Sequence, residues 1–337
     1  KGIEPKLLVS DRCHIIMPYH IELDSALSGH QAELAAGSTG RGIAPVYADK
    51  MFRNGIRMID LLEPDILKQK LEKGYAFAKG IIEKSLNKKM ISEPRSIFQD
   101  YIDFGIKLKN YVSDTSVELY KAHQNGKSIL FEGAQGISLD VDHGIYPYTT
   151  SSNTAAGHIS TGTGVSFRDI GRIIGVVKAY LSRVGESPLP SEIDGEMAEK
   201  IRDVGGEYGT TTGRPRRIGW LDLVQVRQAV RVNGLTEIAL TKLDVLNGIK
   251  EIPVCIDYEI DGSTVSEMPA SLTMYRNAKP VYKTLEGWDS IPDNIWDKGF
   301  NALPKEIHNY IDFIEQAVGC SVKIISVGPQ RHETIIR

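Results

Sequence analysis

The sequence IALTKLD at residues 238–244 places three apolar side chains directly before a polar loop. A short apolar run bounded by polar or glycine-rich residues is typical of a strand buried inside a sheet. The same arrangement recurs in three other places: IIGVV at 173–177 leads to SRVG at 182–185, VKII at 322–325 leads to SVGP at 326–329, and SILF at 128–131 leads to EGAQG at 132–136. We therefore expect four buried strands, each followed by a polar loop.

Helical patterns accompany these predicted strands. Segments 64–93 and 98–124 carry apolar residues at helical spacing among many charges, and a further helix is expected over 221–232. Buried strands that alternate with helices predict an α/β fold with a largely parallel central sheet flanked by helices. Ligands of such sheets bind beyond the carboxyl ends of the strands, so the four polar loops are expected to line one crevice.

We expect one α/β domain over residues 1–337, because no linker, internal repeat or low-complexity tract divides the chain. Two parts depart from the alternation of strands and helices. They are a helical insertion at about 60–125 and a hairpin with an irregular excursion at about 250–300. The hairpin is indicated by the alternating Val254, Ile256, Tyr258 and Ile260, because a period of two is typical of a half-buried strand.

The composition favours a soluble, cytoplasmic protein. Of the 337 residues, 41% are hydrophobic and 25% are charged, and the formal net charge is −3. No apolar run approaches the roughly 20 residues that cross a bilayer. The three cysteines lack CxxC spacing and indicate neither a disulfide framework nor a zinc site. The acidic balance disfavours nucleic acid and anionic membranes as main partners.

The most polar cluster of the chain is GTTTGRPRR at 209–217, in which three threonines and three arginines surround Gly213. A guanidinium presents a planar fork of donors that matches a carboxylate or a phosphate, and hydroxyls and glycine amides can complete such a cradle. Because the whole chain is slightly acidic, a specific small anion fits this loop better than a polyanion such as RNA.

The loops TKLD at 241–244 and SVGP at 326–329 each have two interpretations. A carboxylate after a strand can accept from the N1–H and the N2–H₂ of guanine together, which adenine cannot offer, and a lysine stem can lie across the base. SVGP, at the end of another strand, can offer backbone groups to the same base. The alternatives are an aspartate that caps the next turn for TKLD and an ordinary turn for SVGP.

Three further clusters carry polar groups that suit a ligand. GSTGRGIAP at 37–45 can hold a phosphate through amides and hydroxyls, with Arg53 and Arg57 nearby, or it can be a glycine-rich surface loop. It is not a P-loop, because GxxxxGK[ST] occurs nowhere. TTSSNT at 149–154 can hold a ribose or a phosphate, or cap a helix. DVDHG at 140–144 matches no strong metal-ligand motif, so a hydrogen-bonded turn is favoured there over a metal or acid–base site.

Taken in order, these segments resemble the adenylosuccinate synthetase family. The likeness rests on GSTGRGIAP at 37–45, FEGAQG at 131–136, DHGIYPYTTSSNT at 142–154, SRVGESPLPSE at 182–192, EYGTTTGRPRRIGWLD at 207–222, LTKLDVLNG at 240–248 and ISVGP at 325–329. The series spans nearly the whole chain, and its order makes it far more specific than any one member.

The resemblance implies an architecture like that of the P-loop NTPases and a GTP-dependent ligase of AMP synthesis. Such an enzyme joins IMP to L-aspartate with Mg²⁺ present and yields adenylosuccinate, GDP and phosphate. A base removes the N1 proton of IMP, the 6-oxygen attacks the γ-phosphate of GTP, and the amine of aspartate then displaces phosphate. A homodimer is also implied. The alternative is a non-catalytic guanine-nucleotide binding module.

By position in the motifs, the resemblance implies three groups of contacts. The IMP contacts are Thr39, Gln135, Thr150, Val184 and Arg214, with Arg53 reaching the IMP of a neighbouring subunit. The aspartate contacts are Thr210, Thr211, Thr212, Gly213, Arg214, Pro215 and Arg216, of which Arg216 bridges towards GTP. The other GTP contacts are Lys242, Leu243, Asp244, Ser326, Val327 and Gly328.

Family members begin with a glycine-rich GDEGKGK loop and an Asn-x-Gly-His segment. These carry the catalytic Asp and His, a phosphate-binding Lys and a Mg²⁺ ligand. Neither motif occurs in the 337 residues. We therefore expect a chain without this N-terminal segment, with no catalytic or metal-binding residue of its own and with little or no turnover alone.

Overall fold

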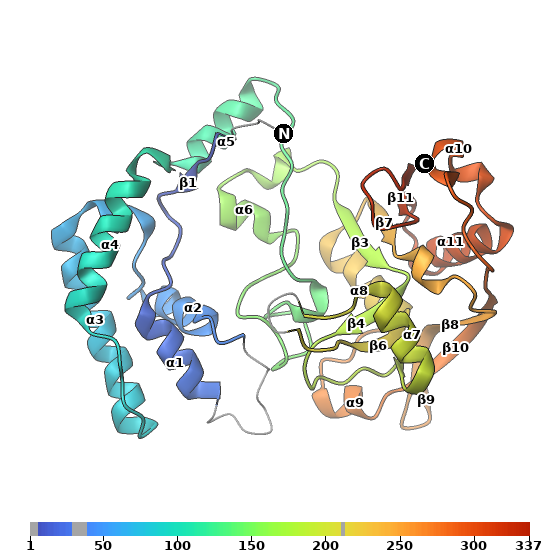
Figure 1. Cartoon of the computed structure of the whole chain (residues 1–337), viewed down its shortest axis with the longest axis horizontal. Coiled ribbons are helices and arrows are strands. Elements are labelled where there is room, and N and C mark those ends of the chain that lie inside the picture. The colour runs from blue at the N-terminus through green and yellow to red at the C-terminus, as the bar shows by residue number, and fades with distance from the viewer. Residues whose placement is uncertain (1–5, 29–38, 210–212) are drawn as a thin grey trace. The chain divides into compact units, whose positions relative to one another are not determined.

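The structure is a computed structural model that describes residues 6–28, 39–209 and 213–337 (Figure 1). Contacts within the chain divide it into two compact units. Unit 1 comprises Lys1–Gln135, Asp140–Asp142 and Pro147–Asp169, and unit 2 comprises Gly136–Leu139, His143–Tyr146 and Ile170–Arg337. The expectation of a single domain stays a prediction. Within the described ranges, no helix is both long enough and apolar enough to cross a membrane.

Unit 1 is mainly helical. Its helices are α1 (Pro18–Ser28), α2 (Ile43–Phe52), α3 (Pro64–Lys79), α4 (Pro94–Leu108), α5 (Thr115–Gln124) and α6 (His158–Thr163), with 3-10 turns at Met58–Leu62, Lys109–Tyr111 and Phe167–Asp169. The short strands β1 (Val9–Ser10) and β2 (Val112–Ser113) pair in parallel. The helices enclose a buried apolar core that includes Met17, Ile56, Leu67, Leu71 and Ile82.

The helices predicted at 64–93 and 98–124 are present in part. α3 begins at Pro64, a residue suited to the first helical turn, and continues as a π-helical turn over Gly80–Ser85. The second prediction of one continuous helix is wrong. α4 ends at Leu108, and α5 begins after Asp114, whose carboxylate accepts from the backbone N–H groups of Ser116 and Val117. A capping aspartate of this kind starts a new helix without interrupting the apolar spacing that predicted one.

The central sheet of unit 2 has the strand order β12-β11-β7-β3. β3 (Ile174–Lys178), β7 (Glu237–Thr241) and β11 (Val322–Ser326) are parallel, and β12 (Thr334–Ile336) is antiparallel to β11. Unit 2 also contains the helices α7 (Gly195–Gly205), α8 (Leu223–Asn233), α10 (Ile295–Lys298) and α11 (Lys305–Val318). Three of the four predicted strands, the helix predicted over 221–232 and the α/β fold class are thereby confirmed.

Two antiparallel sheets complete unit 2. One has the order β4-β6-β5, formed by β4 (Tyr180–Arg183), β6 (Arg217–Trp220) and β5 (Glu192–Ile193). The other has the order β10-β8-β9, formed by β10 (Lys279–Glu286), β8 (Glu251–Ile260) and β9 (Ser263–Val265), with α9 (Leu272–Arg276) between β9 and β10 in the chain. Short 3-10 turns lie at Ile137–Leu139, Leu243–Leu246 and Phe300–Ala302. Unit 2 therefore combines one mainly parallel sheet with two antiparallel sheets.

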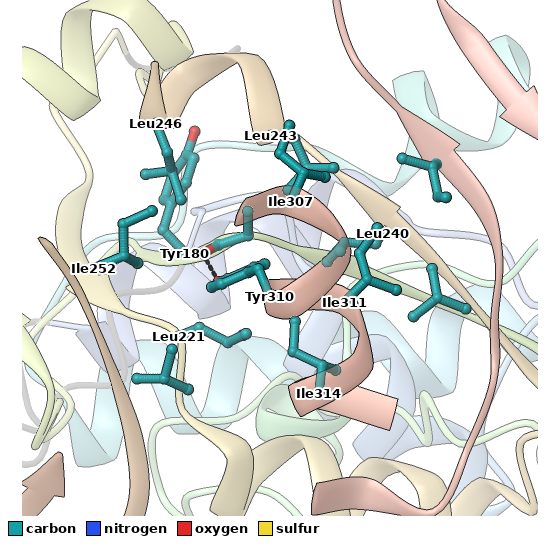
Figure 2. Close-up of a cluster of buried hydrophobic side chains, with 14 of the residues drawn as sticks. Tyr180, Leu221, Leu240, Leu243, Leu246, Ile252, Ile307, Tyr310, Ile311 and Ile314 are labelled. Atoms are coloured by element: carbon teal, nitrogen blue, oxygen red, sulfur yellow. Dashed lines mark hydrogen bonds between the residues drawn. The ribbon is translucent and has the colours of Figure 1, made fainter. Parts of the chain in front are cut away.

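A large apolar core packs α11 against the central sheet (Figure 2). The buried face of α11 carries Ile307, Tyr310, Ile311, Ile314 and Val318, which recur at helical spacing. The polar end of the buried Tyr310 ring is satisfied, because its hydroxyl donates to the carbonyl oxygen of Ala179 at 2.8 Å. Ala179 follows β3 directly, so this bond attaches the helix to the carboxyl end of that strand.

The run SILF at 128–131 is not a strand, contrary to the prediction. The structure assigns no regular element to these residues, and the side chain of Leu130 is 86% exposed. A strand requires partners for its backbone N–H and C=O groups. No described strand pairs with this run, and composition alone could not indicate that.

The expectation that four polar loops line one crevice also needs correction. TKLD and SVGP follow the neighbouring parallel strands β7 and β11 and therefore lie at one sheet edge. The residues Ser182 and Arg183 of the SRVG segment instead belong to β4, which pairs antiparallel with β6 in a separate sheet. The sequence could not reveal this, because only Ala179 separates the end of β3 from the start of β4.

Replacement of a core side chain on α11 is expected to destabilise unit 2. Ile311→Ala removes buried methyl groups and leaves a cavity, which should lower the free energy of unfolding by about 2–5 kcal/mol. Asp312→Ala changes an exposed residue of the same helix and should cost less than about 0.5 kcal/mol. Urea unfolding followed by circular dichroism measures both, and equal losses would contradict the packing described for α11.

Candidate functional site

The described ends of the arginine-rich loop pair with each other through their backbones. Tyr208 and Pro215 form an isolated antiparallel bridge, and the N–H of Arg216 donates to the carbonyl of Glu207 at 2.9 Å. Inside the bridge, the N–H of Gly209 donates to the carbonyl of Arg214 at 2.8 Å. Gly213 has φ +64°, a conformation that favours glycine. The predicted aspartate contacts Thr210, Thr211 and Thr212 lie outside the described residues.

A buried carboxylate holds the base of this loop. Glu207 is only 1% exposed and accepts three hydrogen bonds: from Lys178 Nζ at 2.6 Å, from the Tyr180 hydroxyl at 2.7 Å and from Arg216 Nη1 at 2.6 Å. Burial by itself raises the pKa of Glu207. The hydrogen bonds from Lys178 and Tyr180 and the charge of Lys178 outweigh burial and lower that pKa to about 2. Arg216 is therefore held by an ionised partner.

The third arginine of the loop, Arg217, serves the structure of its own sheet. Its guanidinium forms a two-bond fork with the carboxylate of Glu192, and its Nη1 donates to the carbonyls of Gly185 at 3.0 Å and Ser187 at 2.6 Å. These bonds hold the segment that follows Val184, a predicted IMP contact whose side chain is exposed. Arg214 and Arg216 are therefore the arginines of this loop best suited to a ligand.

The TKLD loop presents a carboxylate with one unsatisfied oxygen. Asp244 Oδ1 is buried and has no hydrogen-bond partner among the described residues. Burial raises the pKa of this carboxyl group because it disfavours the charged form, and this effect outweighs the lowering by backbone hydrogen bonds and by the charge of Lys242. Lys242 adopts φ +67°, and its Nζ donates to the carbonyl of Gly205 at 3.0 Å. The side chain of Leu243 lies in the apolar core, so only its backbone is available to a ligand.

The SVGP loop lies beside TKLD because β7 and β11 are adjacent and parallel. Ser326 Oγ donates to the carbonyl of Gly328 at 2.9 Å, and the N–H of Val327 donates to the carbonyl of Glu333 at 3.0 Å. A Cβ at Gly328 would lie 2.4 Å from Glu333 Oε2, so no side chain fits there without a rearrangement. The loop therefore places its backbone groups at the same sheet edge as Asp244.

The glycine-rich loop of unit 1 is anchored by buried polar side chains. The N–H of Gly42 donates to Asp24 Oδ2 at 2.9 Å, and His20 Nε2 lies 2.9 Å from Asp49 Oδ2. Because the N–H of Met17 donates to His20 Nδ1 at 3.0 Å, the bond to Asp49 requires a proton on Nε2. Thr39, at the start of the described part of this loop, is exposed.

Strained backbone coincides with three predicted ligand contacts. Among the described residues, six non-glycine residues have positive φ, and they are Arg53, Asn87, Gln135, Lys242, Asp261 and Asn294. Such conformations cost free energy and cluster at functional sites. Arg53 and Gln135 are predicted IMP contacts, and Lys242 is a predicted GTP contact. Arg53 and Gln135 both belong to unit 1, as does the half-buried Thr150.

The acidic segment at 140–144 is used structurally in part. The buried carboxylate of Asp140 accepts from the N–H groups of Asp142 at 3.0 Å, Thr154 at 2.5 Å and Ala155 at 3.1 Å. It thereby fixes the TTSSNT run in unit 1. Within the part of the chain that the structure describes, no group of three His, Cys, Asp or Glu side chains is arranged to hold a metal ion.

The structure adds three residues that the sequence did not single out: Lys178, Tyr180 and Glu207. Only weak signals pointed to them. Lys178 follows a predicted strand directly, and Glu207 lies just before the GTTTG turn. Their importance depends on the folded structure, which brings residues 29 and 27 positions apart in sequence into one hydrogen-bonded cluster.

Comparison with known proteins gives a consistent family. The family model described as adenylosuccinate synthetase matches residues 1–335. The adenylosuccinate synthetase of Geobacter sulfurreducens is 49% identical over 330 residues, which are 98% of this chain and 76% of that protein. That of Thermodesulfovibrio yellowstonii is 45% identical over 339 residues, covering 100% of this chain and 78% of that protein.

The fold also matches a solved structure. The structure of fully ligated adenylosuccinate synthetase from Plasmodium falciparum superposes with a TM-score of 0.90 at 32% identity. The match covers 98% of this chain and 78% of that one. Sequence and structure thus agree on the same family.

The ionic bonds of Glu207 are expected to make stability depend on pH. The pKa of Glu207 is about 2 in the folded protein against an ordinary 4.5, so its contribution is complete above pH 4.5 and is lost as the pH falls towards 2. Between these values the group adds a slope of up to about 1.4 kcal/mol per pH unit to the free energy of unfolding. Urea unfolding from pH 7 to pH 3 should show a shallower acid slope for Glu207→Gln. Identical slopes would contradict the low pKa.

Proposed function

Because the chain belongs to the adenylosuccinate synthetase family, a family of ligases, we propose that it serves the GTP-dependent joining of IMP and L-aspartate. The products are adenylosuccinate, GDP and phosphate. In this proposal residues of unit 2 hold GTP and aspartate. A cytoplasmic location is also proposed, because the family is cytoplasmic in general.

The observation that carries the proposal is the orphaned carboxylate oxygen of Asp244. A buried Oδ1 without a donor is costly unless a ligand supplies one. The N1–H and N2–H₂ groups of guanine supply two donors side by side, whereas adenine presents an acceptor at N1. The backbone of Val327 and Gly328 follows the neighbouring strand at the same sheet edge and is proposed to frame the base. GTP is therefore the nucleotide that this loop suits.

The arginine-rich loop is proposed as the aspartate site. Arg214 and Arg216 offer charged donors for the two carboxylates, and Arg216 is oriented by Glu207. Gly213, Pro215 and the three threonines at 210–212 complete the proposed contacts. A loop closed by the Tyr208–Pro215 bridge suits a small dianion.

The proposed IMP contacts are Thr39, Arg53, Gln135, Thr150, Val184 and Arg214. Gln135 holds a positive φ value in the structure, which supports a ligand role for it, whereas the positive φ of Arg53 belongs to the left-handed C-cap of α2. Arg53 is proposed to reach the IMP of a second subunit. Its neighbours Met51 and Phe52 are exposed apolar side chains, which is typical of an interface between subunits.

The family uses Mg²⁺ together with GTP. Mg²⁺ prefers oxygen ligands from one or two carboxylates and from substrate phosphates. The described residues provide no cluster of potential ligand side chains, and none is assigned to the ion. The expectations that its protein ligands lie in the N-terminal segment of the family, and that the 337 residues alone turn over little, stay predictions. An assay for adenylosuccinate with the 337-residue chain tests the second.

Asp244→Asn is expected to weaken the preference for GTP over ATP. The amide places a donor where guanine needs an acceptor, which should remove about 1–3 kcal/mol of discrimination, or roughly 5- to 150-fold. Calorimetric dissociation constants for GTP and ATP measure the ratio. Asp289→Asn, which alters an exposed carboxylate of unit 2 paired with Lys250, is the matched control. An unchanged ratio in Asp244→Asn would remove the base-reading role.

Arg214→Leu is expected to impair the use of aspartate. Loss of a charged donor to the substrate carboxylates should cost about 2–4 kcal/mol of transition-state stabilisation in the full enzyme and lower kcat/KM for aspartate accordingly. Arg231→Leu removes an exposed arginine of α8 that pairs with Glu267 and should change nothing. Steady-state kinetics with varied aspartate compares the two. If Arg214→Leu leaves kcat/KM unchanged, the assignment of this loop to aspartate is wrong.

A further inference from the structure

The cluster around Glu207 lies between the two loops proposed to hold aspartate and guanine. On one side, Glu207 Oε2 accepts from Arg216, whose guanidinium makes no other hydrogen bond to a described residue. On the other side, Glu207 Oε1 accepts from Lys178 and Tyr180. Lys178 is the last residue of β3 and also donates to Ser182 Oγ at 2.6 Å. The carboxylate is thus shared between the loop and the sheet.

The same turn of chain also holds the lysine of the guanine loop. α7 ends at Gly205, and Gly206 follows with φ +60°. The carbonyl of Gly205 accepts from Lys242 Nζ at 3.0 Å, only two residues before Glu207. A Cβ at Gly205 would lie 2.3 Å from the Tyr180 hydroxyl, so the turn is packed directly against the cluster. A displacement of Glu207 would therefore move a backbone acceptor of Lys242.

We propose that Glu207 is a positioning residue that aims Arg216 at the bound substrates and couples the aspartate loop to the guanine loop through Gly205 and Lys242. This inference rests on the proposed function, because it requires aspartate and GTP as ligands of these loops. Glu207 itself touches neither ligand. It acts by fixing one guanidinium and the end of α7 at the same time.

The charge of Glu207 is essential to this role. Lys178 and Arg216 are both cations, and each is within 2.6 Å of a carboxylate oxygen. Without the negative charge, the two cations repel each other at close range, and Arg216 loses the partner that orients it. A glutamine has the same shape and can still accept from one or two donors. Glu207→Gln therefore separates the charge from the packing.

The test measures the coupling between ligands by calorimetry with IMP present. Aspartate is titrated into the protein with and without GDP, and the ratio of the two dissociation constants is the coupling factor. We expect roughly a 5-fold or larger factor for the unmodified protein and a factor near one for Glu207→Gln. Glu237→Gln is the control, because Glu237 is also buried and ion-paired, with Arg172, at the opposite end of β7.

A double variant separates positioning from stability. Glu207→Gln with Lys178→Met removes the surplus half-buried cation and should recover the melting temperature lost in Glu207→Gln. The coupling factor should stay near one, because Arg216 still lacks a charged partner. Recovery of coupling together with melting temperature would show a purely structural role and overturn the inference.

The remaining outcomes distinguish this inference from the proposed function. An unmodified protein that binds neither aspartate nor GDP contradicts the proposed function itself. An unmodified protein that binds both, with a coupling factor of one or with a factor that survives Glu207→Gln, overturns only the inference.

Discussion

The parallel pairing of β7 with β3 on one side and β11 on the other is the constraint on which the rest of unit 2 depends. Val177 and Ile325 both lie opposite Leu240, so the three strands end at nearly the same level. The residues that follow them must then emerge at one edge of the sheet, where ligands of α/β proteins bind. Lys178, Asp244 and the SVGP loop share that edge for this reason.

Among the described residues, buried carboxylate oxygens differ in whether they have a hydrogen-bond donor, and this difference separates structure from function. Glu207 accepts three donors, and Asp222 caps α8 and accepts from the Tyr258 hydroxyl. Asp244 Oδ1 has no donor among the described residues. A protein can maintain such an atom at low cost only when a ligand completes it. The TKLD loop therefore indicates a ligand more strongly than any of the satisfied carboxylates does.

Local patterns predicted a large part of the fold correctly. Three predicted apolar runs form the parallel strands, and the helix predicted at 221–232 is α8. Both kinds of element could be predicted because the local order of apolar residues indicates burial and helical periodicity. The prediction of a strand at SILF was wrong, since a strand also needs a partner strand that no local pattern encodes. The predictions of a continuous helix across Asp114 and of a polar loop at SRVG failed for a related reason. A single cap or a one-residue connection changes the path of the chain without changing its apolar spacing.

The sequence by itself determined the family and the chemical types of the ligand loops, because those depend on which residues occur and in what order. Tertiary structure alone decided how these residues are used. It committed Arg217 to Glu192, buried the side chain of Leu243 and left Asp244 Oδ1 without a donor. It also assembled Lys178, Tyr180, Glu207 and Arg216 into one cluster. Hydrogen-bond partners and burial are properties of distances between segments remote in the chain, and only the folded backbone sets those distances.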